Sequence, residues 1–159
     1  SERWYAENKE GLLGCERLYV LGYGLDHGSM LEGMLKVGEM LRIPTIGYEM
    51  VEYTHGPTMA IKPNQAIIMI AGDGPEFAAM QEFRLKFLEF TKHVHVISRT
   101  AFSGSTKNDV LFDEVRNAWI APLAYTVPLQ ILAVRGAEDS GIDTNIDPFG
   151  TALAHYQEV

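Results

Sequence analysis

Short apolar segments alternate along this chain with longer amphipathic segments, and no other feature constrains the fold as much. The apolar segments carry few or no charges, as strands do when helices cover both faces of their sheet. They are residues 18–21, 44–48, 66–70 and 94–98. Helical apolar spacing marks residues 29–42, 75–92 and 128–136. This alternation predicts an α/β fold in three layers, with a parallel sheet and right-handed crossovers.

Length and composition predict a single domain over residues 1–159. With 47% hydrophobic residues, a chain of this length can bury most of its surface around one core. Its 13 basic and 21 acidic residues give a net charge of −8, which argues against nucleic acid or an anionic membrane surface as a partner. No stretch reaches the roughly 20 apolar residues of a membrane span. The lone cysteine, Cys15, fits a reducing, cytoplasmic setting.

In a parallel sheet, ligands bind where the carboxyl ends of the strands turn into the next helix. The loops after the four predicted strands are residues 22–28, 49–57, 71–75 and 99–109, and we expect them to share one rim. Glycines at 22, 24 and 28 lack the dinucleotide-binding spacing and are explained by a tight turn. No set of side chains has zinc-like spacing, so the sequence predicts neither a cofactor nor a metal.

Two carboxylates and an ammonium form a stripe on the helix predicted at residues 29–42. At about 100° per residue, Glu32, Lys36 and Glu39 fall within a sector of roughly 60°. One interpretation is an exposed helix face with a Glu-to-Lys pair four residues apart, which stabilises helices slightly. The other is the wall of a polar cleft, where a carboxylate beside a cation stays ionised and can act as a base.

A histidine follows the second predicted strand, in the sequence EYTHGP at residues 52–57. The Gly-Pro pair marks a turn, so His55 is expected on the rim of the sheet. Histidines beside such turns often serve only the structure. An imidazole at a binding rim is also suited to proton transfer near neutral pH, and both interpretations stay open on spacing alone.

The stretch LYVLGYGLDHGSMLEGMLKVGEM followed by EYTHGP resembles the C-terminal SIS (sugar isomerase) domain shared by the isomerase half of glucosamine-6-phosphate synthase and by fructosamine-6-phosphate deglycases. The resemblance runs from about Leu18 to Asp147 and includes EGMLKVGE at 32–39, the HGP turn, Pro-Leu-Gln at 128–130 and Asp-Pro at 147–148. It implies a three-layer sandwich around a flavodoxin-like, five-stranded parallel sheet. It also implies that the chain is the C-terminal half of a protein with two SIS domains.

The resemblance also implies roles for individual residues. Glu39 is the base that moves a proton between C1 and C2 of an opened phosphosugar, and His55 is the acid/base in ring opening or amine departure. Lys36 and Glu32 are implied to bind the substrate, which is a sugar phosphate or a fructosamine phosphate. Because this histidine can come from the neighbouring subunit in such enzymes, a homodimer is implied. The chemistry needs no cofactor.

The sequence departs from the family pattern in two places, at the carbonyl-binding lysine and at the phosphate-binding loop. Where the synthase has a lysine for the sugar carbonyl, this chain has His155, and an imidazole cannot form the imine that a primary amine forms. This favours a deglycase-like enzyme, with His155 as a substrate contact or a surface residue. The phosphate-binding Ser/Thr loop belongs to the missing N-terminal domain, so low activity of the isolated domain is expected. The loop 103–106 is better explained as a surface turn. A synthase and a non-catalytic phosphosugar sensor remain the alternatives.

Overall fold

Five parallel strands form the centre of the computed structural model, which describes residues 1–72, 74–148 and 150. The strands are β1 Arg17–Gly22, β2 Thr45–Glu49, β3 Gln65–Ala71, β4 Val94–Ser98 and β5 Asp109–Leu111, and their order in the sheet is β2-β1-β3-β4-β5. Every neighbouring pair is parallel. This order is flavodoxin-like and reverses between β1 and β3. The predicted α/β fold is therefore confirmed.

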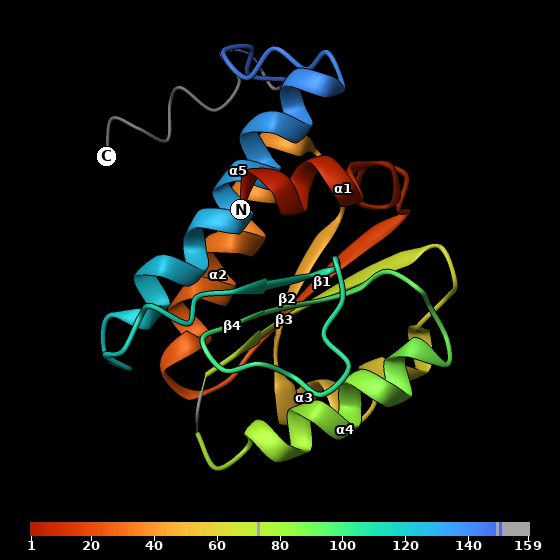
Figure 1. Ribbon diagram of the computed structural model, residues 1–159. Coiled ribbons are helices and arrows are strands. Elements are labelled where there is room, and N and C mark those ends of the chain that lie inside the picture. The colour runs from red at the N-terminus through yellow and green to blue at the C-terminus, as the bar shows by residue number, and fades with distance from the viewer. Residues whose placement is uncertain (73, 149, 151–159) are drawn as a thin grey trace, which may run out of the picture.

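Helices cover both faces of the sheet (Figure 1). On one face lie α1 Glu2–Leu13, α2 His27–Lys36 and α5 Ala121–Asp139, and on the other lie α3 Met50–Thr54 and α4 Phe77–Leu88. Short 3-10 helices occupy Gly24–Asp26 and Pro57–Ala60, and a π-helical turn occupies Val37–Leu41. Two apolar cores result, one on each face. All seven residues of β3 are buried between them, whereas every residue of the edge strand β2 is only half-buried.

The last helix is longer than the sequence predicted. We expected it to begin near Pro128, but α5 begins at Ala121 and continues through Pro128. A proline inside a helix removes one backbone hydrogen bond. Here the apolar face on both sides of it is fully buried, as Tyr125, Leu129 and Leu132 show, and that burial outweighs the loss.

Helices α2 and α5 approach each other closely because glycines lie at their contact. A side chain at Gly33 would collide with Leu129 of α5, and one at Gly136 would meet Leu41 at 2.9 Å. Near the start of both helices, the hydroxyl of Ser29 donates to the carbonyl of Pro122 at 2.8 Å. The whole length of α2, including the π-helical turn that continues it, is therefore fixed against α5.

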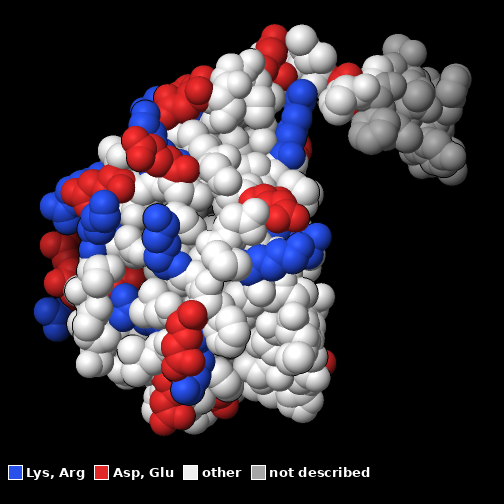
Figure 2. All heavy atoms as spheres, turned by 90° about the vertical axis from the view of Figure 1, so that its right-hand side faces the viewer, with Lys and Arg blue, Asp and Glu red and all other residues white. Residues whose placement is uncertain are grey.

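Figure 2 shows the side of the molecule that lies to the right in Figure 1. Lysine and arginine side chains are interspersed there with aspartate and glutamate, and neither sign forms a continuous patch. In the described part of the chain, no helix combines the length and the apolar character that crossing a bilayer requires. Likewise, the described side chains include no group of three or more metal-ligating residues placed to hold an ion.

Candidate functional site

Glu39 lies in the π-helical turn Val37–Leu41 that continues α2. Such turns widen the helix by one residue, are rare, and occur frequently at functional sites. Val37 and Leu41 are buried, whereas the Glu39 side chain is exposed. Arg42 then adopts the left-handed conformation, with φ 59° and ψ 24°, which few non-glycine residues do. The turn therefore exposes Glu39 to solvent, while the buried side chains of Val37 and Leu41 fix its backbone against the core.

Lys36 holds the Glu39 carboxylate. Its Nζ donates to Oε2 of Glu39 at 3.0 Å, and the two side chains are 34% and 56% exposed. The hydrogen bond to Glu39, with the charges of Glu39 and of Glu32, raises the pKa of Lys36. The Lys36 ammonium therefore stays protonated beside the Glu39 carboxylate. The observed pair joins residues three apart, and not the Glu32–Lys36 pair four apart that an exposed helix face predicts.

A groove of about 610 Å³ opens beside Glu39. Its described lining comes from the π-helical turn, the start of β2 and the segment after α5: Gly38, Glu39, Arg42, Ile43, Pro44, Thr45, Asp147 and Pro148. Nη2 of Arg42 donates to the carbonyls of Ile146 at 2.8 Å and of Asp143 at 3.3 Å. The segment after α5 is thereby held against the turn that carries Glu39. His155 lies outside the described residues.

His55 lies on the opposite side of the sheet from Glu39. It directly follows α3, where its backbone N–H donates to the carbonyl of Glu52 at 3.2 Å, and the residue is exposed. Glu49 begins this helix, because its side chain accepts the backbone N–H groups of Val51 and Glu52. Since α3 belongs to the core formed with α4, and α2 to the core formed with α5, the chain does not bring Glu39 and His55 together within one molecule.

A second cavity, of about 360 Å³, lies at the carboxyl ends of β1, β3 and β4. Asp26, which is 4% exposed, accepts the N–H of Gly72 there at 2.8 Å. The N–H of Arg99 donates to the hydroxyl of Tyr125 at 3.1 Å. We expected four loops to share this rim, but the described lining comes from only three of them, from Ala118 before α5 and from the start of α5. The loop after β2 leaves the rim because α3 turns it onto the face of the sheet. Asp73 of the third loop lies outside the described residues.

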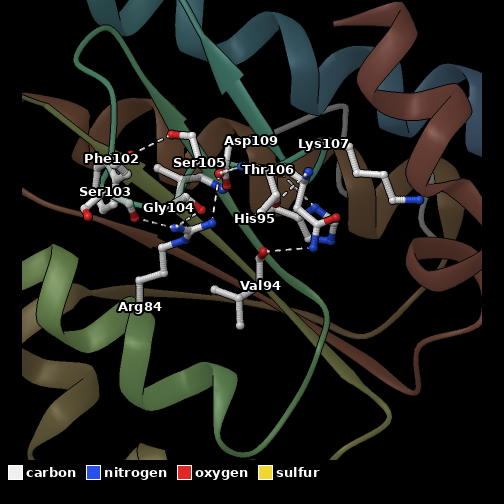
Figure 3. A network of polar contacts seen from close by, with 12 residues as sticks. Arg84, Val94, His95, Phe102, Ser103, Gly104, Ser105, Thr106, Lys107 and Asp109 are labelled. Carbon is white, nitrogen blue, oxygen red and sulfur yellow. Dashed lines mark hydrogen bonds and ion pairs between the residues drawn. The ribbon is translucent and has the colours of Figure 1, made fainter.

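The side chains of Arg84 and Asp109 hold the loop of residues 103–106 through its backbone groups (Figure 3). Arg84, whose side chain is 3% exposed, donates through Nη1 to the carbonyls of Ser103 and Gly104, both at 3.1 Å. Its Nη2 pairs with Oδ2 of Asp109 at 2.8 Å, and the N–H of Thr106 donates to the same oxygen at 2.9 Å. Burial raises the pKa of Asp109, although Thr106 and Arg84 oppose the shift. This arrangement supports the interpretation of the loop as a structural turn, since its carbonyls point to the buried guanidinium.

Comparison with known proteins identifies the family. Residues 11–135 match the family described as SIS domain. The chain belongs to the SIS domain family. The resemblance inferred from EGMLKVGE and EYTHGP is thereby confirmed, together with the fold it implied. This SIS domain is 30% identical over 129 residues to a glutamine–fructose-6-phosphate aminotransferase (isomerizing) of Acinetobacter baylyi, an alignment that covers 79% of this chain and 21% of that protein.

Solved structures show the same fold. A candidate phosphosugar isomerase of Clostridium difficile 630 superposes with a TM-score of 0.84 at 24% identity, over 98% of this chain and 43% of that chain. The C-terminal domain of glucosamine-fructose-6-phosphate aminotransferase of Francisella tularensis gives 0.70 at 22% identity, over 90% of this chain and 39% of that one. The SIS domain thus spans about a fifth of the curated relative and about two fifths of these solved chains.

Three features of this site were absent from the sequence interpretation: the π-helical turn, the left-handed Arg42 and the segment that Arg42 holds. One local signal pointed to the second of them, the conformation of Arg42. A residue before proline disfavours the helical conformation, so Pro44 requires the helix to end before Ile43 and leaves Arg42 to make the turn. No comparison tests the individual roles, which stay predictions.

Proposed function

We propose that this chain is the C-terminal SIS domain of a two-SIS-domain phosphosugar enzyme, with the activity of a fructosamine-6-phosphate deglycase or a related aldose–ketose isomerase. The observation that carries the proposal is the Lys36–Glu39 pair, set in a π-helical turn beside a groove. The partial coverage of longer relatives supports a second domain elsewhere in the same protein. The proposal includes a cytoplasmic location.

The proposed chemistry is a proton transfer between C1 and C2 of an opened sugar. The carboxylate of Glu39 takes the proton from one carbon and returns it to the other, and Lys36 positions that carboxylate by its hydrogen bond and contacts substrate hydroxyls with Glu32. A positioned base contributes typically 10²- to 10⁴-fold to the rate of such a step. No cofactor is required, since a base, an acid and an opened sugar suffice.

His55 completes this site from a second copy of the chain. Within one molecule His55 directly follows α3 and Glu39 lies in the turn that continues α2, and these helices pack on opposite faces of the sheet, so one histidine cannot serve the glutamate of its own chain without a large rearrangement. A homodimer in which each copy supplies His55 to the other gives two equivalent sites.

A glucosamine-6-phosphate synthase is the second candidate, because the curated relative carries the name of that aminotransferase. His155 argues against it, since the position that resembles the carbonyl-binding lysine holds an imidazole, which cannot form the imine. A phosphosugar sensor is the third candidate, and a Glu–His pair is unnecessary for sensing.

Product analysis with the full-length protein separates the three candidates. The protein is incubated with 6-phosphofructose-lysine, or with fructose 6-phosphate and ammonia, and glucose 6-phosphate and glucosamine 6-phosphate are measured by coupled assays. We expect glucose 6-phosphate from the first substrate. Glucosamine 6-phosphate from the second would establish the synthase instead. Saturable binding of a sugar phosphate without any product would establish the sensor.

A further inference from the structure

Arg42 links two parts of the chain that are a hundred residues apart. Its Nη2 donates to the carbonyls of Ile146 and Asp143, while its backbone directly follows the π-helical turn that carries Glu39. Among the described residues it is the only non-glycine with a positive φ. A bulky residue in that conformation marks a position that the surrounding structure determines.

The segment that Arg42 binds is itself an ordered turn. The N–H of Ile146 donates to the carbonyl of Asp143 at 3.3 Å. The carboxylate of Asp143 accepts the backbone N–H of Asn145 at 2.9 Å and its side-chain amide at 3.0 Å. Guanidinium groups are planar and present their donors in a fixed geometry. Arg42 therefore binds a turn that has its own internal hydrogen bonds.

We propose that Arg42 is a positioning residue that sets the width of the groove beside Glu39. It holds residues 143–146, and the two residues that follow, Asp147 and Pro148, form the wall of the groove that faces the π-helical turn. The inference rests on the proposed function of Glu39. It adds that the segment after α5 is part of the substrate-binding wall, and that Arg42 orients the sugar phosphate by fixing that wall.

Within the described residues, the wall is held on one side by the end of α5 and on the other by Arg42, and a single substitution can remove the contact with Arg42. The covalent anchor is α5, which is fixed to the π-helical turn where Leu41 packs on Gly136. The second anchor is the pair of hydrogen bonds from Arg42. Without them the segment stays attached at Ile142, whose N–H donates to the carbonyl of Ala137 at 2.9 Å and whose side chain packs against the core, but residues 143–146 lose the hydrogen bonds that hold them against the π-helical turn. The Lys36–Glu39 pair is not touched by this change, so substrate binding should suffer more than the chemical step.

The test compares Arg42→Asn with Arg135→Gln in the full-length protein. Asparagine tolerates the left-handed conformation, so the first variant removes the guanidinium without straining the backbone. Arg135 is an exposed arginine of α5 that pairs with two carboxylates and serves as the control. Spin labels at Gly38→Cys, where an added Cβ meets open space, and Pro148→Cys report the separation of the two walls. Cys15 and any exposed cysteine elsewhere in the protein are replaced beforehand.

We expect dipolar broadening between the labels in the starting protein and in Arg135→Gln, and its loss in Arg42→Asn. In unlabelled protein, Arg42→Asn should raise the KM for the phosphosugar roughly tenfold and change kcat less than about threefold. Unchanged broadening in Arg42→Asn overturns the inference, because the wall then does not depend on Arg42. Lost broadening with an unchanged KM overturns it too, because the wall then does not orient substrate.

Glu39→Gln separates this inference from the proposed function. The substitution removes the base but none of the hydrogen bonds of Arg42, so the label spectrum should be unchanged while turnover falls. If Glu39→Gln keeps full turnover, the proposed function fails, and the role of Arg42 at that groove fails with it. If turnover falls in Glu39→Gln and the KM is normal in Arg42→Asn, only the inference about Arg42 fails.

Discussion

Two lysine–glutamate pairs in this molecule have the same spacing and the same geometry. Lys36–Glu39 and Lys86–Glu89 both join residues three apart, and in both the Nζ lies 3.0 Å from a carboxylate oxygen. The surroundings differ. Lys86–Glu89 spans the regular end of α4 and its side chains are 70% and 60% exposed, whereas Lys36–Glu39 spans the junction of α2 and a π-helical turn beside a groove. Lys36–Glu39 is a candidate site because of the π-helical turn and the groove around it, and not because of the ion pair itself.

The comparison also shows what solvent does to an ion pair. Water screens exposed charges, and holding two long side chains in one geometry costs entropy, so such pairs contribute little to folding. Their charges remain available to a ligand. Arg84–Asp109 is the opposite case, because its side chains are 3% and 9% exposed and the Asp109 carboxylate also accepts the backbone N–H groups of Thr106, in the loop before β5, and of Val96, in β4. Exposure, then, separates groups that stabilise the fold from groups that can do chemistry.

The largest effect on stability should come from the buried pair. Arg84→Met leaves the Asp109 carboxylate without its cation in a buried place, and breaking a pair in this way costs about 3–5 kcal/mol. Urea denaturation, followed by circular dichroism, measures the loss. Lys86→Met, two residues along the same helix, is the matched control and should change the free energy of unfolding by less than about 0.5 kcal/mol. A loss below about 1 kcal/mol for Arg84→Met would show that burial does not distinguish the two kinds of pair.

A buried histidine should make stability depend on pH. His95 is 1% exposed, and burial lowers its pKa to about 4 from the ordinary value of 6.5. Its Nδ1 lies 3.1 Å from the carbonyl of Asn108, and since a carbonyl only accepts, Nδ1 carries the proton of the neutral ring.

Below pH 6.5 the unfolded chain binds a proton that folded His95 does not bind until about pH 4. The free energy of unfolding should therefore fall by about 3 kcal/mol as the pH decreases from 6.5 to 4, and be unaffected by His95 above 6.5. Urea denaturation at several pH values measures this slope. In His95→Phe, which keeps a ring against Trp4, the slope should be smaller. An equal slope in both proteins would assign the pH dependence to other groups.

The two glutamates should differ in activity. In the full-length protein, Glu39→Gln should lower kcat/KM for 6-phosphofructose-lysine by about a hundredfold, which corresponds to about 2.7 kcal/mol of transition-state stabilisation. Glu89→Gln removes a carboxylate of identical spacing and should leave kcat/KM unchanged. Steady-state release of glucose 6-phosphate measures both. A decrease of less than about tenfold in Glu39→Gln contradicts the assignment of Glu39 as the base.

The fold was predictable because buried strands leave a strong signal in the sequence. Each of the four predicted strands is a short run of apolar residues, and β3 is buried on both faces over all its seven residues. The fifth strand had no such signal. It has three residues and begins with Asp109, whose carboxylate forms an ion pair with Arg84. Neither its length nor its composition marks it as a strand.

The site was predictable only as far as helical periodicity holds. Periodicity placed Lys36 and Glu39 on one stripe, and the two side chains do meet. It cannot reveal the π-helical turn, because the extra residue changes the phase without changing the composition. The contact between Arg42 and residues 143–146 was invisible for another reason. Its acceptors are backbone carbonyls, which every residue has, so no pair of side chains records it.

The smallest expected effect is the contribution of the two exposed pairs to stability. Lys36→Met and Lys86→Met each keep the length of the side chain and remove its charge, and each should lower the free energy of unfolding by less than about 0.5 kcal/mol. Urea denaturation at low and at high salt measures the loss in each variant, and high salt should make both losses smaller because it screens exposed charges. Equal small losses fit a Lys36–Glu39 pair that serves a ligand and not the fold. A loss above about 1 kcal/mol in Lys36→Met alone would mean that the pair holds the π-helical turn in place, and that Glu39 stabilises the turn on which it stands.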